Sequence, residues 1–180
     1  MCLDPAYREM VDRNLANNSS EVFCNFSRAH AEYIISQFIA RANNSIEILT
    51  GNFDDDLYNN ISVETLLGDA AARIAKNGGK IRIITLAGKR SVALDEMVER
   101  INGNLALPEG DSQKIVQYCA GTCAEPEKVN HYIIVDKMRY RLEEPHKQEP
   151  ECVHAEICCN GPQRSAQLLA GFNKAWRILA

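Results

Sequence analysis

The residues best suited to chemistry gather between positions 129 and 143 of an otherwise acidic chain. His131 stands on an apolar stretch, and Arg139, Arg141 and Glu143 follow at two-residue spacing, which puts these three on one face of a strand. An arginine presents a planar fork of donors that fits phosphate or carboxylate, and a histidine exchanges protons near neutral pH. The cluster therefore predicts a binding site for a phosphate-bearing group. A solvated hairpin, in which Arg141 and Glu143 simply pair, is the alternative interpretation.

A second candidate segment is the polar loop that follows residue 50. Gly51 and Asn52 come directly after an apolar stretch that reads as a strand. Ligands of α/β sheets bind outside the ends of such strands, and a glycine there lets the backbone come close to a ligand. We expect Gly51 and Asn52 to line the same pocket as His131. The acids at 54–56 lack the spacing of a calcium loop, so we interpret them as solvated.

The seven cysteines suggest two further chemistries, and their spacing favours neither. A Cys3His ligand set for zinc is offered by Cys119, Cys123, Cys152 and His154. The last two would share a strand face, whereas zinc ligand pairs usually lie in a turn. Cys158 lies four residues from His154 along an extended segment, which is too far for a nucleophile and its base. No nucleotide-binding glycine motif occurs either. We expect no metal and no cofactor.

Composition bounds the class of protein. The chain has 180 residues, is 46% hydrophobic, and carries 24 acidic against 20 basic side chains for a net charge of −4. These values suit one globular domain and exclude a disordered or fibrous protein. They also disfavour a generally basic surface for nucleic acid or membranes, although a local basic groove remains compatible with them. We expect no transmembrane segment and no secretory signal, and the odd cysteine count favours a cytoplasmic, reducing compartment.

Hydrophobic periodicity predicts the helices and strands that position these residues. Apolar spacing typical of helices occurs at 27–42, from 62 to 76, at 92–101 and from 162 onward, and a short helix is expected within the first 20 residues. The expected strands are 45–50, 80–86, 114–118, 130–135, 138–142 and 152–159, with a tight turn at Asp136 and Lys137. Helices between the early strands imply a parallel sheet in that half of the chain. The fold class is therefore α/β.

The segment Val129–Glu143 resembles the signature strand of the phospholipase D superfamily, H-x-K-x-x-x-x-D, because an apolar strand runs into Asp136 at a turn. The resemblance covers residues 22–180 and leaves 1–21 as an N-terminal extension. It implies a single domain with a mixed sheet flanked by helices. When Asp136 is aligned with the aspartate of the motif, Val129 takes the place of the nucleophilic histidine and His131 that of the lysine. When His131 is aligned with the nucleophile, Asp136 falls two residues early.

In either alignment the motif is degenerate, so the resemblance implies a binding or regulatory module and not a working enzyme. The expected ligand carries phosphate, as in nucleic acid, a nucleotide or a lipid headgroup, and a protein partner is a further interpretation. The alternative is a metal-independent phosphodiesterase or nuclease that uses His131 as nucleophile at a dimer interface. Single-motif members of the superfamily build one site from two copies, so the resemblance also implies a homodimer with His131 near its two-fold axis.

Overall fold

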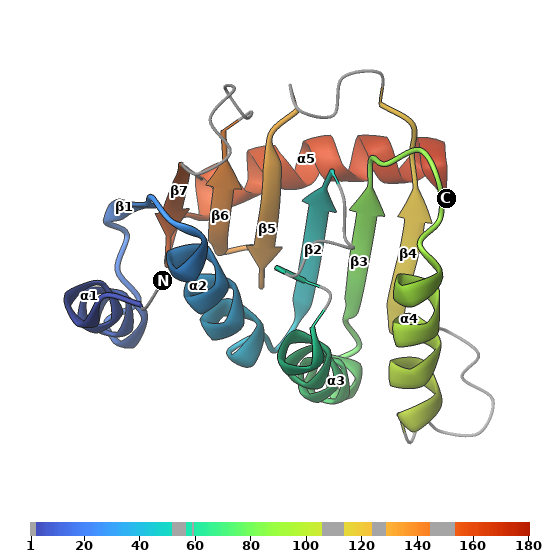
Figure 1. Ribbon diagram of the computed structural model, residues 1–180, viewed down its shortest axis with the longest axis horizontal. Helices are drawn as coiled ribbons and strands as arrows, with labels where there is room; N and C mark the ends of the chain where they lie inside the picture. The colour runs from blue at the N-terminus through green and yellow to red at the C-terminus, as the bar shows by residue number, and fades with distance from the viewer. Residues whose placement is uncertain (1–2, 52–56, 59, 106–113, 124–128, 145–153) are drawn as a thin grey trace.

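A seven-stranded mixed sheet forms the centre of the molecule, and helices cover both of its faces (Figure 1). The computed structural model describes residues 3–51, 57–58, 60–105, 114–123, 129–144 and 154–180. The strands are β1 (Val22–Asn25), β2 (Ser45–Thr50), β3 (Lys80–Thr85), β4 (Val116–Ala120), β5 (His131–Val135), β6 (Arg139–Glu143) and β7 (Ala155–Cys158). The helices are α1 (Pro5–Ala16), α2 (Arg28–Ala40), α3 (Ile61–Lys76), α4 (Val92–Asn104) and α5 (Pro162–Leu179). The α/β class with a mixed sheet is thereby confirmed.

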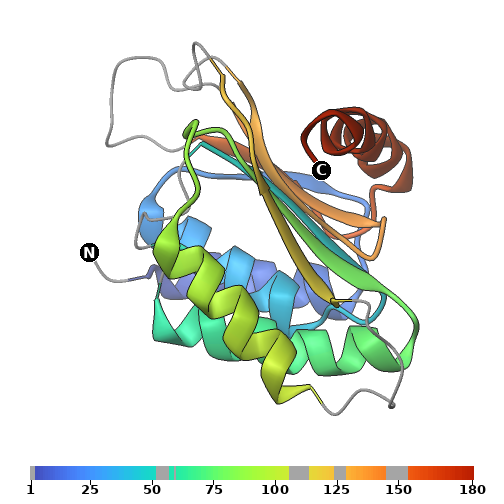
Figure 2. The same cartoon turned by 90° about the vertical axis from the view of Figure 1, so that its right-hand side faces the viewer.

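The strands lie in the order β1-β7-β6-β5-β2-β3-β4. β2, β3 and β4 are parallel, as the intervening helices predict, and the remaining neighbours pair antiparallel. Helices α1 to α4 pack on one face, here called the helix-layer face, and α5 crosses the other face, here called the α5 face (Figure 2). No described helix is long and apolar enough to cross a membrane.

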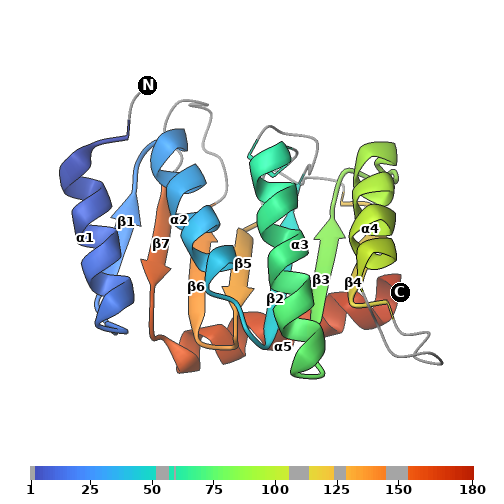
Figure 3. The same ribbon diagram turned by 90° about the horizontal axis from the view of Figure 1, so that it is seen from below.

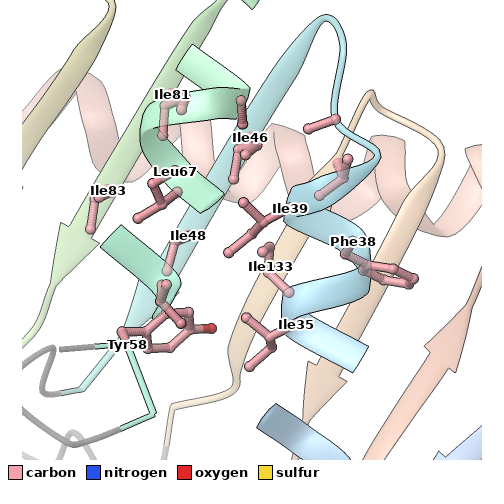
Figure 4. Close-up of a cluster of buried hydrophobic side chains, with 14 of the residues drawn as sticks. Ile35, Phe38, Ile39, Ile46, Ile48, Tyr58, Leu67, Ile81, Ile83 and Ile133 are labelled. Carbon is pink, nitrogen blue, oxygen red and sulfur yellow. The ribbon is translucent and has the colours of Figure 1, made fainter. Parts of the chain in front are cut away.

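The main hydrophobic core lies between the sheet and α1 to α4. Ile39 of α2, Ile46 of β2 and Ile133 of β5 are completely buried there, and Figure 4 shows them meeting between the layers. Val11 of α1 belongs to the same buried cluster, so the helix predicted within the N-terminal extension packs on the core. A smaller cluster on the α5 face includes Phe172, which stacks on Trp176.

Three sequence expectations about element bounds are corrected. α4 continues through Asn104, where a break was expected at 102, because the Asn102 amide bonds both its own helix and β4. β4 begins at Val116, not 114. The four-residue β1 was not expected at all, since so short a stretch shows no periodicity. The turn at Asp136 and Lys137 is confirmed, with φ values of 54° and 58°.

Candidate functional site

At one end of the strands, the sheet carries a line of polar side chains on the helix-layer face. Glu143 faces His131 across β5 and β6, and it faces Ala155 across β6 and β7, which in turn faces Asn25 of β1. On the other side of His131, Thr50 and Thr85 end the parallel strands β2 and β3 opposite each other. We call this set the polar row: Asn25, Glu143, His131, Thr50 and Thr85.

A buried ion pair anchors the polar row. Arg141 is 1% exposed, and its guanidinium lies 2.8 Å from a Glu143 carboxylate oxygen. Its Nε donates a hydrogen bond of 2.9 Å to the Asn25 side chain. A buried charge is tolerated when a partner and hydrogen bonds replace its hydration, and both are present here. The Arg141 guanidinium is thus paired within the protein. A ligand would instead contact the groups beside it, such as His131.

His131 is the half-buried member of the polar row, and it packs against Gly51 at the end of β2. A Cβ atom added to Gly51 would lie 3.0 Å from His131 Cε1 and 3.1 Å from Nε2. The close approach therefore depends on glycine at this position. The structure brings together Gly51, His131, Arg141 and Glu143, four of the residues expected to form one pocket.

Three helices begin at the same edge as the polar row, where β2 and β3 end (Figure 3). Each is capped by a side chain that accepts a hydrogen bond from the first turn: Ser27 for α2, Asn60 for α3 and Ser91 for α4. The start of a helix carries partial positive charge, so it favours a nearby anion. This edge is therefore electrostatically better suited to a phosphate than the net charge of the chain suggests.

Two buried phenols, Tyr58 and Tyr7, lie within electrostatic reach of Arg141. Burial raises the pKa of Tyr58, and the neighbouring charge of Arg141 opposes that rise. Burial also raises the pKa of Tyr7, whose ring stacks on His30 at 3.7 Å between α1 and α2. Both phenols remain neutral near physiological pH, so they add no negative charge beside Glu143.

Arg139 lies at the far end of the hairpin, opposite Val135. Its guanidinium is 3.3 Å from Asp136, whose carboxylate accepts hydrogen bonds from the backbone N–H groups of Asn43, Asn44 and Ser45. Asp136 thereby holds the loop before β2 against the turn of the hairpin. The geometry does not bring Arg139 to the polar row.

Several expectations fall on residues outside the described part of the chain: Asn52, the acids at 54–56, and Cys152 of the weighed zinc set. Among the described residues, no group of three or more histidine, cysteine or acidic side chains is arranged to hold a metal. Cys119 is buried beside the α5 face, and burial raises the pKa of its thiol.

Four members of the site were missed from the sequence, and two of them, Thr50 and Thr85, end strands that were themselves expected. Asn25 ends the unexpected strand β1, and Tyr58 follows the polar loop at 51–57. A signal for Asn25 was present, because only two residues separate the apolar triplet 22–24 from the helix cap Ser27. Tyr58 gives no such signal, since a lone tyrosine in a polar stretch does not reveal that it is buried.

Comparison with known proteins gives structural matches only. No protein-family model and no curated protein sequence matches the chain. Nuc from Salmonella typhimurium, a phospholipase D family member, superposes with a TM-score of 0.61 at 16% identity, over 89% of this chain and 96% of that one. NucT from Helicobacter pylori superposes with a TM-score of 0.58 at 11% identity, over 89% and 99% of the two chains.

A third match is TrmBL2, an archaeal chromatin protein with a novel mode of DNA binding. It superposes with a TM-score of 0.56 at 13% identity, over 97% of this chain and 60% of that one. At these identities the matches establish the fold and leave the activity open. The chain has the phospholipase D-like fold.

Proposed function

We propose that this phospholipase D-like chain is a non-catalytic module that binds a phosphate-bearing ligand at the polar row and serves a regulatory role. The observation that carries the proposal is the polar row itself, with half-buried His131 at its centre, at the strand ends where α2, α3 and α4 begin. Histidine donates to phosphate oxygens in its protonated form, and the three helix starts add to the same field.

The surroundings of Val129 support the absence of catalysis. In the alignment that fixes Asp136, this residue takes the place of the nucleophilic histidine, and its side chain packs against the apolar cluster on the α5 face. A valine forms no bond to phosphorus. The position of Asp136 at the hairpin turn favours this alignment over the one that makes His131 the nucleophile.

The structural neighbours favour nucleic acid as the source of the phosphate. TrmBL2 binds DNA and spans nearly all of this chain in the superposition. A nucleotide and a lipid headgroup present the same phosphate chemistry, so the experiment must separate these sources.

Binding is tested by fluorescence anisotropy with labelled single-stranded DNA, duplex DNA and a labelled nucleotide, and by co-sedimentation with vesicles containing anionic lipid. We expect His131→Gln to weaken binding about tenfold, the loss of roughly one charge-assisted hydrogen bond. Lys76→Ala is the matched control, because it removes one exposed cationic side chain at the last turn of α3, far from the polar row. Equal affinity of wild type and His131→Gln for every probe would contradict the proposal.

Cleavage is measured in the same samples with a generic phosphodiester in the presence of EDTA. The proposal expects no turnover. Turnover that disappears in His131→Gln and survives in Lys76→Ala would replace the module by the alternative phosphodiesterase, with His131 as its nucleophile.

A further inference from the structure

An exposed aromatic ring stands directly beside the polar row. Phe26 follows Asn25, the last residue of β1, and it is 59% exposed. Among the described residues, five large hydrophobic side chains are exposed, and Phe26 is the one aromatic among them. A single exposed apolar side chain is common on protein surfaces, so the meaning of Phe26 depends on what surrounds it.

A second ring lies next to Phe26. His154 directly precedes Ala155, the first residue of β7, and it is exposed as well. Because Asn25 lies opposite Ala155, Phe26 and His154 continue the two strands side by side. Their ring centroids are 5.2 Å apart, and the ring planes are tilted by 58°. A tilted contact does not cover both faces of either ring, so a further flat group can stack there. We call Phe26 and His154 the ring pair.

The ring pair and the polar row lie at the same strand ends but toward opposite faces of the sheet. The Asn25 side chain accepts a hydrogen bond from Arg141 on the helix-layer face, and Ala155 shares that face as its neighbour across the strands. Successive side chains of a strand alternate, so Phe26 and His154 lie toward the α5 face. Figure 3 shows β1 running into the start of α2 beside β7. A ligand that crosses the strand ends here would contact both sets of side chains.

The charges on the two faces differ as a nucleotide strand requires. On the helix-layer face, the starts of three helices favour an anion. Toward the α5 face, burial raises the pKa of the Cys24 thiol, and the carboxylates of Glu156 and Glu144 raise it further, which places both acids near β1. Carboxylates repel a phosphate and have little effect on an uncharged base. The phosphates therefore fit the helix starts, and a base fits the ring pair.

The distance between the ring pair and His131 limits the ligands that can contact both. The strands β1, β7, β6 and β5 are consecutive, and neighbouring strands lie about 4.8 Å apart, so β1 and β5 are about 14 Å apart. A single nucleotide or lipid headgroup is too short for this distance, whereas several linked nucleotides span it. In a duplex each base is covered by its neighbours in the stack, so a base that stacks on a side chain must come from an unpaired strand.

We propose that the ring pair is a base-stacking subsite, and that the ligand of the polar row is a single-stranded nucleic acid. One phosphate contacts His131, and a base further along the strand stacks on Phe26, whose ring His154 holds in place. The inference rests on the proposed function, because it takes the polar row as the phosphate site and adds the base as a second recognised group. Every base has a flat face, so the subsite accepts all of them.

The experiment compares two labelled probes of about 12 nucleotides by fluorescence anisotropy of the full chain: an oligothymidylate and an abasic strand of equal length and charge. The wild type should bind the oligothymidylate about tenfold more tightly, as expected for one base stacked on an aromatic side chain. Phe26→Ala should remove this preference. Phe26→Trp should retain it, because an indole ring also stacks, and its fluorescence should change with the oligothymidylate and not with the abasic strand.

Ile178→Ala is the matched control. Ile178 is 75% exposed near the end of α5, which lies beside β4 at the other side of the sheet from β1. The substitution removes a similar amount of exposed apolar surface, and the preference for the oligothymidylate should persist. An equal preference in Phe26→Ala and Ile178→Ala would overturn the subsite. Duplex DNA bound as tightly as the oligothymidylate would overturn it as well.

His131→Gln separates this inference from the proposed function. It should weaken binding of both probes, since both carry the phosphates that the polar row contacts. Equal wild-type affinity for the two probes, with both weakened by His131→Gln, would overturn the base-stacking subsite and leave the phosphate site standing. Absence of binding to either probe would overturn the phosphate site and the subsite together.

Discussion

Two arginine–glutamate pairs lie on opposite faces of the same sheet, and their surroundings differ. On the helix-layer face, Arg141 and Glu143 are both nearly inaccessible, with 2% and 7% of their side chains exposed. On the α5 face, Arg82 of β3 lies 3.1 Å from Glu47 of β2, with 20% and 3% exposed. The residue types and distances are similar, so these features alone do not separate a structural pair from a functional one.

The neighbours of each pair show the difference. The Arg82 guanidinium lies over the rings of Phe172 and Trp176 at 5.0 and 5.6 Å and donates to the Asn173 side chain, so α5 encloses it. Arg141 instead stands two positions from the end of β6, where Glu143 faces half-buried His131. We infer that Arg82 fastens α5 to the sheet, whereas Arg141 holds the carboxylate beside His131 in place.

The largest expected effect comes from Arg141→Met, which keeps most of the side-chain volume and removes the charge. Glu143 is then left buried without its cationic partner, and such losses cost about 3–5 kcal/mol. Urea unfolding of the full chain measures the change. A loss below about 1 kcal/mol would show that the two pairs do not differ as described.

Arg82→Met is the matched substitution on the other face, and we expect a smaller loss of about 2 kcal/mol at pH 7. Burial already raises the pKa of Glu47, and Arg82 is the main group opposing that rise. Without Arg82 the carboxyl takes up a proton and avoids a buried charge. The loss should therefore shrink as pH falls toward 4.5, the ordinary pKa of a glutamate. Unfolding curves at several pH values test this, and a loss independent of pH would contradict it.

The smallest expected effect is that of Glu47→Gln, about 1 kcal/mol or less at pH 7. Because burial raises the pKa of Glu47 in the folded state, folding favours its protonated form. The contribution of Glu47 to stability is therefore fully present below pH 4.5 and is lost as pH rises through the folded-state pKa. The variant should gain stability relative to wild type over that rise. A difference that moves the other way would mean that Arg82 outweighs burial.

The sequence predicted most elements for local reasons. Apolar spacing and the cap Ser27 indicate α2 directly, and the turn at Asp136 and Lys137 follows from the hairpin pattern. The different partners of Arg139 and Arg141 were not predictable from the sequence. Arg139 and Arg141 share a strand face, but their partners differ. Arg141 is held beside Glu143 partly by Asn25 of β1, and Arg139 meets Asp136, which Asn43 also contacts. These contacts join residues far apart in the sequence.

Asn102 bears on what happens at high protein concentration. A sheet with two open edges can add copies at both sides without limit, as fibres do, whereas a sheet with one sealed edge cannot. Because Asn102 occupies the outward N–H and C=O of Val116, a strand from another chain cannot pair with β4 at this position. One amide side chain thus hinders growth by strand addition at the β4 edge.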